Sequence, residues 1–263
     1  MQPLVYYPLI ALALVCAIML CAWVWGTVIK NYSVVDAFWA ANFAVVAVII
    51  YANINTSSHR TLLVSLLAFI WSLRLTLHLG NRIFSHINEE EGRYKQLRKE
   101  WANHLHVKFF IFFQMQAISN VLLAFPFFII ALNPSPNLSF IEYVGAAIWA
   151  ISIVGEAIAD VQLHQFKKNS LNKGKVCDVG LWFYSRHPNY FFQLMIWMGV
   201  SIFAITAPFG IWSLISPLSI GYLLFKVTGI PMTEAQAIKT RGQAYIDYQQ
   251  TTSVFIPWFK KKI

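Results

Sequence analysis

The sequence predicts an all-α, polytopic membrane protein, and three observations support this fold class. Hydrophobic residues make up 58% of the 263 residues and charged residues only 12%, whereas soluble domains carry about 25% charged residues. The apolar residues form long runs, and a helix that spans a bilayer needs about 20 of them. The lysines and arginines fall in short clusters between these runs, as is typical of residues that face cytoplasm and anionic headgroups.

About seven transmembrane helices are expected in a single integral membrane domain that covers residues 1–263. The candidate spans are residues 4–28, 34–51, 61–80, 108–132, 140–162, 190–206 and 209–228. The first two spans and the last two spans are joined by very short turns, which predicts tight antiparallel pairs. Pro208 leaves an alternative open, in which the last two spans form one broken helix.

The basic residues also predict the orientation in the membrane. With the N-terminus outside, the segments 81–107, 163–189 and 229–263 face the cytoplasm, and Arg60 is the one basic residue in the outer linkers. Lysine and arginine favour the cytoplasmic side, so the C-terminus and any polar site are expected there. The net charge of +9 therefore indicates a membrane surface rather than a nucleic-acid partner. The three cysteines imply no disulfide framework.

The inner end of the fifth span places four ionisable residues on one helix face. Glu156, Asp160, His164 and Lys167 follow one another at spacings of four, four and three residues, and residues so spaced are neighbours on a helix. Carboxylates inside an apolar span are costly unless they face a protein interior or water and have partners. Two interpretations remain open: a salt bridge to an arginine of another span, or the wall of a polar cofactor site, which could include such a bridge.

The start of the second span and the end of the third span also carry charges. Asp36 and Arg74 are natural partners near the inner membrane face, and a structural ion pair competes with a catalytic role for Asp36. The stretch SHINEEEGRYKQLRKEW after the third span suits an interfacial or cytoplasmic helix. Its acidic run, residues 89–91, is expected to be a solvated surface.

Residues 180–193 read GLWFYSRHPNYFFQ, a short polar island between apolar stretches. Pro188 suits the first turn of a helix, and the free backbone N–H groups at a helix start bind anions such as phosphate. Arg186 adds a guanidinium fork, and Asn189 and Tyr190 add hydrogen-bonding groups. A metal site is not expected, because His187 has no His or Cys at ligand spacing.

The C-terminal segment offers a possible cover for this island. Glu234, Lys239, Arg241, Tyr245 and Tyr248 are expected on one helix after Pro231. This helix is either an amphipathic interfacial helix or a lid over a cofactor site beside Asn189. The following FIPW suggests that the tail packs back on the membrane face, and KKKI at 260–263 suits a membrane-surface charge cluster.

These motifs together resemble the steroid 5-alpha-reductase superfamily, and most closely its bacterial DUF1295 branch. The resemblance rests on GLW-x-YSRHPNY, on E-x-x-x-D followed by FKK, on W-S-L-R-L-x-x-H and E-G-R-Y-K-x-L-R, and on the tail R-G-x-x-Y-x-x-Y-x-x-x-T-S-x-FIPW. It covers the chain from about residue 34 to the end. It also implies a bacterial inner-membrane location.

The resemblance implies seven transmembrane helices and NADPH bound at the cytoplasmic side by a C-terminal part of about residues 140–263. It implies hydride transfer to a carbon–carbon double bond of a lipophilic enone, with an acid at the carbonyl. By position, the resemblance puts cofactor contacts at Glu156, Asp160, Lys167 and Asn189, and more loosely at Tyr245 and Tyr248. The further residues expected to bind the cofactor are Arg186, His187, Tyr190, Gln193 and Arg241.

The chain departs from the pattern of these families at three places. PNYFGE of the relatives is PNYFFQ here, so Phe192 replaces a glycine and Gln193 replaces a glutamate that faces the cofactor. The Gln-Glu pair around the substrate carbonyl has no counterpart, and Trp71 stands at the position of a substrate tyrosine. Tyr32 and Asp36 are therefore expected to supply the carbonyl-side acid.

Two other functions remain open from the sequence. The isoprenylcysteine carboxyl methyltransferases share the RHP-x-Y and tail patterns, so S-adenosylmethionine is the alternative cofactor. The departures at Phe192 and Gln193 also suit a lipid-binding relative without catalysis. The partners expected are membrane lipid and a lipophilic small molecule, and the sequence does not predict an oligomeric state.

Overall fold

The computed structural model describes residues 2–53, 59–227 and 229–261. Within these residues the regular elements are helices, apart from one isolated bridge between Ser185 and Ser253. Six segments are long and apolar enough to cross a membrane: Pro3–Val28, Val34–Asn53, His59–Phe84, Leu105–Ala131, Phe140–Lys168 and Gly210–Arg241. The prediction of an all-α, polytopic membrane protein is confirmed. The predicted linker 52–60, the predicted span end at Thr228 and the end of KKKI fall partly outside the described residues.

The sixth predicted span is a shorter helix than the others. Helix α8 (Pro188–Ala204) has 17 residues, which makes it about 26 Å long at 1.5 Å per residue, against a hydrocarbon core of about 30 Å. The chain then turns over residues 205–209, where Phe209 has a φ of 64°. The next segment begins only at Gly210. The two predicted spans are therefore separate helices and do not form one broken helix.

The chain divides into two compact units. Unit 1 comprises Met1–Leu138 and Ala204–Ser213, and unit 2 comprises Ser139–Phe203 and Leu214–Ile263. The boundary at Ser139 lies beside residue 140, where the sequence places the start of the C-terminal cofactor part.

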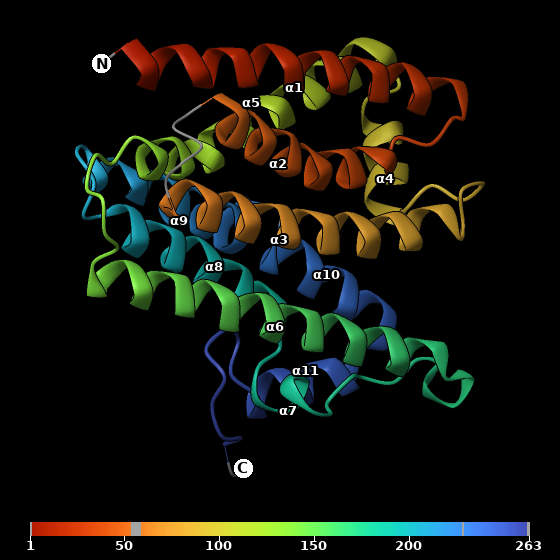
Figure 1. The fold of residues 1–263 in the computed structure, drawn as a ribbon. Helices are drawn as coiled ribbons and strands as arrows, with labels where there is room; N and C mark the ends of the chain where they lie inside the picture. Colours follow the sequence, from red (N-terminus) through yellow and green to blue (C-terminus); the bar gives the residue numbers. More distant parts are fainter. Residues whose placement is uncertain (1, 54–58, 228, 262–263) are drawn as a thin grey trace. The chain divides into compact units, whose positions relative to one another are not determined.

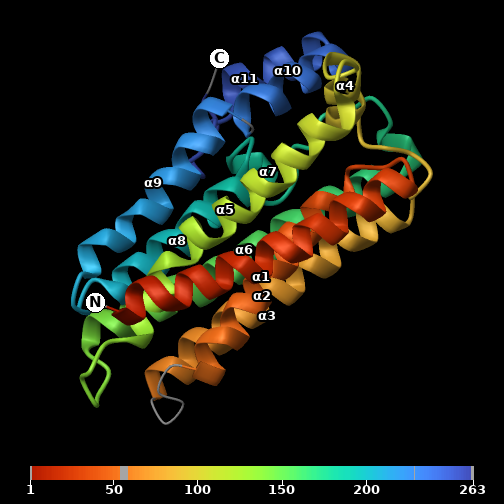
Figure 2. The ribbon, with the colours of Figure 1, turned by 90° about the horizontal axis from the view of Figure 1, so that it is seen from above.

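Unit 1 is built on four long helices. These are α1 (Gln2–Val28), α2 (Val34–Asn53), α3 (His59–Phe84) and α5 (Leu105–Ala131). Helices α1, α2 and α3 run side by side (Figures 1 and 2), and α2 contacts α1, α3 and α5. Buried amides join α2 to α5, because Asn42 donates to Asn120 (2.9 Å) and Asn120 donates to the Trp39 carbonyl (2.9 Å). Such interhelical hydrogen bonds hold helices together where lipid provides no hydrophobic driving force.

Arg60 was the one basic residue expected in the outer linkers, and it is buried. Its guanidinium donates to the backbone carbonyls of Ser135 (2.5 Å) and Asn137 (2.8 Å), and only 2% of the residue is exposed. A guanidinium with its fixed fork of donors suits such neighbouring acceptors. Arg60 therefore fastens the loop after α5, which explains why this cation departs from the charge bias.

Unit 2 begins with α6 (Phe140–Lys168), whose start carries a capping box. The Ser139 amide donates to the Glu142 carboxylate (2.7 Å), and the Glu142 amide donates to the Ser139 hydroxyl (3.4 Å). Helix α6 packs against α8 through two glycines. A Cβ on Gly145 would lie 2.5 Å from the backbone nitrogen of Phe203, and a Cβ on Gly199 would lie 2.7 Å from that of Trp149. The two backbones therefore approach as only small residues allow.

Gly145→Ala is expected to destabilise the protein by about 2–3 kcal/mol, because the added methyl group would overlap backbone atoms that cannot move aside. Gly221→Ala in α9 (Ile215–Tyr222) is the matched control. There the nearest atom to the new Cβ is a methyl group of Leu194 at 3.8 Å, so the change should be neutral or stabilise by up to about 1 kcal/mol. The melting temperatures of both variants in detergent test this, and equal values would contradict the packing.

Candidate functional site

The turn at residues 184–188, in the middle of the polar island, lies against the C-terminal tail. It connects the short helix α7 (Leu181–Tyr184) to α8. The Arg186 amide donates to the Ser253 carbonyl (2.9 Å), and the Ser185 hydroxyl donates to the Phe255 carbonyl (2.8 Å). The tail therefore folds back on this turn and pairs its polar groups.

The Arg186 side chain joins three elements of unit 2. Its Nε donates to the Glu234 carboxylate (2.7 Å) on α10 (Ile230–Arg241), and its Nη1 donates to the carbonyls of Gln249 (2.8 Å) and Thr252 (2.9 Å) at the end of α11 (Gln243–Thr251). The guanidinium expected to hold a phosphate therefore holds the tail helices to the start of α8.

Glu234 is the centre of this network. One carboxylate oxygen accepts from Arg186 and lies 3.1 Å from Nε2 of His187, and the other accepts from the Gln249 amide (2.7 Å). The His187 ring is 2% exposed and stacks on the Tyr190 ring with centroids 5.3 Å apart. Glu234 was expected on the tail helix but was not assigned to the site. It is the one acidic residue of α10, and this was the feature of the sequence that could have indicated Glu234 as the partner of Arg186.

The first turn of α8 brings Asp160 and Asn189 together. The Asn189 amide nitrogen donates to the Asp160 carboxylate (3.3 Å), and its amide oxygen accepts from the Tyr190 backbone (3.0 Å). Asp160 is 8% exposed. The Tyr190 hydroxyl lies 3.2 Å from that of Thr233 on α10. Asp160 and Asn189 therefore present a carboxylate and an amide that can bind hydroxyl groups. The Tyr190 and Phe191 backbone amides of the same turn already donate to the Asn189 side chain and to the His187 carbonyl.

The tail forms two helices rather than the single one that the sequence predicted. Gly242 separates α10 from α11 with a φ of 58°, a conformation that glycine adopts without strain. The Arg241 side chain donates to the Lys175 carbonyl (2.9 Å). As predicted, Tyr245 and Tyr248 share a face, with ring centroids 5.8 Å apart.

The two tail tyrosines are buried donors. The Tyr248 hydroxyl donates to the carbonyls of Trp182 and Ser185. Burial raises the pKa of Tyr248 and of Tyr245 above the ordinary value, and the Glu234 charge raises the pKa of Tyr245 further. Both phenols are therefore neutral at physiological pH, and Tyr248 fixes α11 on α7.

Three predicted cofactor residues lie elsewhere on α6 and α8. Glu156 is buried one helical turn before Asp160, Lys167 is exposed near the end of α6, and Gln193 is half-buried on α8. Phe192, which stands where the relatives have a glycine, packs against a glycine of α6. A Cβ on Gly155 would lie 2.4 Å from the Phe192 ring, so this ring occupies the space that a glycine on α6 leaves beside Glu156.

Unit 1 holds the expected acid Asp36 in a dense ionic network. Its carboxylate accepts from Arg93 (2.9 Å) and from the Tyr94 hydroxyl (2.7 Å), and Arg82 lies 3.5 Å away. Arg93 and Tyr94 belong to α4 (Gly92–Glu100), the helix predicted after the third span. Burial raises the pKa of Tyr94 well above its usual value, and Asp36 raises it further. Asp36 thus forms ion pairs with Arg93 and Arg82, whereas the sequence suggested Arg74 as its partner.

The other expected acid, Tyr32, is a buried phenol. It is 1% exposed, and its ring stacks on Phe109 with centroids 3.8 Å apart. Its hydroxyl lies 3.0 Å from Nδ1 of His106 and 3.2 Å from the Thr27 hydroxyl. His106 is exposed, so the buried hydroxyl is linked through one imidazole to the protein surface.

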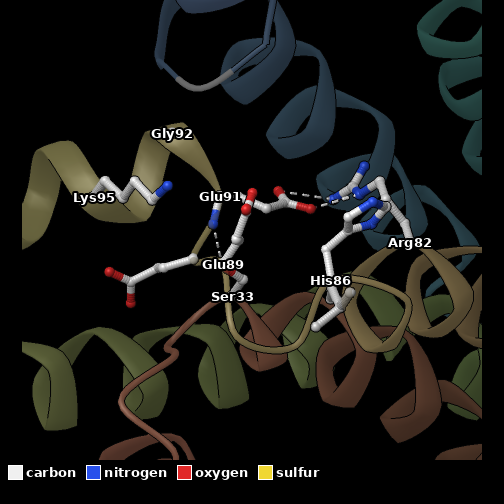
Figure 3. Close-up of a pocket in the computed structure, with 9 residues that line it drawn as sticks. Ser33, Arg82, His86, Glu89, Glu91, Gly92 and Lys95 are labelled. Atoms are coloured by element: carbon white, nitrogen blue, oxygen red, sulfur yellow. Dashed lines mark hydrogen bonds and ion pairs between the residues drawn. The ribbon is translucent and has the colours of Figure 1, made fainter. Parts of the chain in front are cut away.

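A cavity of about 320 Å³ lies in unit 1 beside the ionic network of Asp36 (Figure 3). Arg82 lies on one side of it and Lys95 on the other, and Glu91 binds Arg82 at 2.7 Å. The acidic run 89–91 is only in part the solvated surface that the sequence predicted. Glu89 is exposed, whereas Glu90 is 8% exposed and accepts from Arg98 (2.8 Å). Charged side chains line the cavity, so it does not suit a lipophilic substrate.

Within the described parts of the chain, no three His, Cys, Asp or Glu side chains are grouped as a metal site. No solved structure matches the chain. The chain is 25% identical over 210 residues to the uncharacterized protein C594.04c of Schizosaccharomyces pombe, a match that covers 70% of this chain and 61% of that protein. The family model "Protein of unknown function (DUF1295)" matches residues 22–252. With most of its length matched, the chain belongs to the DUF1295 family.

Proposed function

We propose that the protein is a membrane-embedded, NADPH-dependent reductase of a carbon–carbon double bond in a lipophilic enone. The observation that carries this proposal is the assembly around the start of α8. A hydrogen bond joins Asp160 of α6 to Asn189 in the first turn of α8, and the Tyr248 hydroxyl of α11 donates to the Ser185 carbonyl in the turn just before α8. This assembly joins the C-terminal motifs on which the resemblance to the steroid 5-alpha-reductases rests.

Charge favours NADPH over S-adenosylmethionine. The segments 163–189 and 229–263 contain ten Lys and Arg against three Asp and Glu. NADPH carries several phosphate charges, whereas the sulfonium of S-adenosylmethionine is a cation. A site rimmed by cations attracts the first and repels the second.

The residues of unit 2 fit the parts of NADPH as follows. Exposed cations such as Lys167 would hold phosphates, and Asp160 and Asn189 would bind hydroxyl or amide groups. When bound, NADPH supplies a hydride. Three further residues would position the cofactor site without touching the cofactor: Arg186, Glu234 and Tyr248. Their polar groups already bind within the protein and hold α10, α11 and the island together.

Of the two expected acids, the geometry favours Tyr32. Asp36 accepts hydrogen bonds from an arginine and a tyrosine and so serves as the acceptor of a structural network. Tyr32 carries a hydroxyl group, and exposed His106 lies next to it. A buried phenol that an imidazole can reprotonate suits a general acid at a carbonyl oxygen.

A thermal-shift experiment with the purified protein tests the cofactor. NADPH at about 100 times its dissociation constant should stabilise by roughly 2.7 kcal/mol, a shift of about 5–10 °C. The shift should be lost in Asp160→Ala and Asn189→Ala, and retained in the matched control Asn103→Ala, whose side chain is exposed in unit 1.

Other outcomes would contradict the proposal. A shift with S-adenosylhomocysteine and none with NADPH would favour the methyltransferase. The lipid-binding alternative would gain if neither compound raised the melting temperature. Full NADPH shifts in both folded variants would remove Asp160 and Asn189 from the site.

A further inference from the structure

Four aromatic rings form a continuous exposed surface next to the island. Phe183 and Tyr184 of α7 lie 5.2 Å apart, Tyr184 lies 6.1 Å from Phe259, and Phe259 lies 6.2 Å from Trp258. Their exposed fractions are 38%, 39%, 73% and 68% in the order Phe183, Tyr184, Phe259, Trp258. We call these four residues the aromatic patch.

The backbone presents the patch rather than burying it. The Trp258 amide donates to the Tyr184 carbonyl (2.9 Å), so the tail is hydrogen-bonded to α7 at the centre of the patch. Lys260 lies over the Phe183 ring at 4.4 Å and forms an ion pair with Asp178 at 2.5 Å. Hydrogen bonds and ion pairs thus fix the patch, while the apolar faces of Trp258 and Phe259 point away from any core.

The charges around the patch are mostly positive. Lys260 connects the tail to the segment 167–178, which carries four exposed lysines and, as its one acidic residue, Asp178. Lys261 is exposed beside Lys260. Asp178 is paired with Lys260, so the other charged side chains of this segment and Lys261 are positive.

We propose that the aromatic patch and its lysines bind the anionic headgroup region of the bilayer in which the protein is embedded. Amphipathic rings concentrate at the membrane–water interface, and clustered lysines near a membrane attract anionic lipids. A protein partner would not require this combination, and the positive charge matches phosphatidylglycerol or another anionic phospholipid. The proposal is independent of the cofactor, because none of the four residues of the aromatic patch is assigned to cofactor binding.

Spin-label accessibility tests this surface in the full-length protein. Cys16, Cys21 and Cys177 are replaced by Ala, a nitroxide is placed at Trp258→Cys, and the protein is put into vesicles of phosphatidylcholine with phosphatidylglycerol. We expect the label to collide with oxygen, which partitions into lipid. Its collisions with a water-soluble nickel complex should be at least three-fold fewer than for a label at Gln243→Cys, which is exposed at the start of α11.

Two further arms test the chemistry of the partner. In pure phosphatidylcholine, or in the double variant Lys260→Gln and Lys261→Gln, the label should become at least two-fold more accessible to the nickel complex. Phe259→Cys repeats the measurement at a second side chain that fills no core. Equal nickel accessibility at positions 258 and 243 would overturn the proposal. So would a label shielded from both reagents, since this would indicate a second protein on the patch.

Discussion

Arg186→Ala is expected to destabilise the protein by about 3–5 kcal/mol, one of the two largest effects that the structure predicts. The side chains of Arg186 and Glu234 are 10% and 14% exposed, and removal of one partner of a buried pair leaves an uncompensated charge. The carbonyls of Gln249 and Thr252 lose their donor as well, which adds the cost of buried, unpaired acceptors. Chemical or thermal unfolding in detergent measures the loss.

Two variants separate the positioning role of Arg186 from a direct phosphate contact. Arg186→Lys keeps the charge but loses the fork, so it should lower stability by nearly as much as Arg186→Ala if the arginine acts by joining α10 and α11 to the island. Arg241→Ala is the matched control. This arginine makes its hydrogen bond with the Lys175 carbonyl at the protein surface, so its loss should lower the free energy of unfolding by less than about 1 kcal/mol. Full stability with weakened NADPH binding in Arg186→Lys would contradict the positioning role.

The membrane architecture could be predicted from the sequence because each span is a local property of the chain. Hydropathy over about 20 residues decides whether a segment suits a bilayer, and six predicted spans match candidate segments of the structure. Helix α8 was harder to predict, because its length depends on the turn at 205–209 and on the close approach of Gly199 to α6. The break at Gly242 was also missed, since glycine within a helical pattern is compatible with either outcome.

The site could be predicted only where its residues lie in local patterns. The spacing of Glu156, Asp160 and Lys167 indicated one helix face, and the Pro188 motif indicated a helix start. Glu234 was not assigned, because it joins His187 and Arg186 across 47 and 48 residues. The solvated surface predicted for residues 89–91 was wrong at Glu90 for the same reason, since Glu90 accepts from the Tyr32 amide across 58 residues.

Tyr32→Phe is expected to lower turnover of an enone lipid by 10²- to 10⁴-fold, the usual contribution of a positioned general acid. The change removes one hydroxyl and leaves the ring stacked on Phe109 at 3.8 Å, so the fold should lose only about 1 kcal/mol. The NADPH-induced thermal shift should be unchanged. The measurement is NADPH consumption with an enone that the wild-type protein reduces, together with the melting temperature of each variant.

Companion variants distinguish an acid from a structural phenol at position 32. His106→Ala leaves the Tyr32 hydroxyl without the imidazole 3.0 Å away, and we expect a smaller fall in turnover because water can replace an exposed imidazole as a proton source. Asp36→Asn should lower the melting temperature with a lesser effect on turnover, because Asp36 serves the contacts with Arg93 and Tyr94. Turnover in Tyr32→Phe within two-fold of the wild type would remove Tyr32 from the reaction, and a selective loss in Asp36→Asn would assign the acid to Asp36.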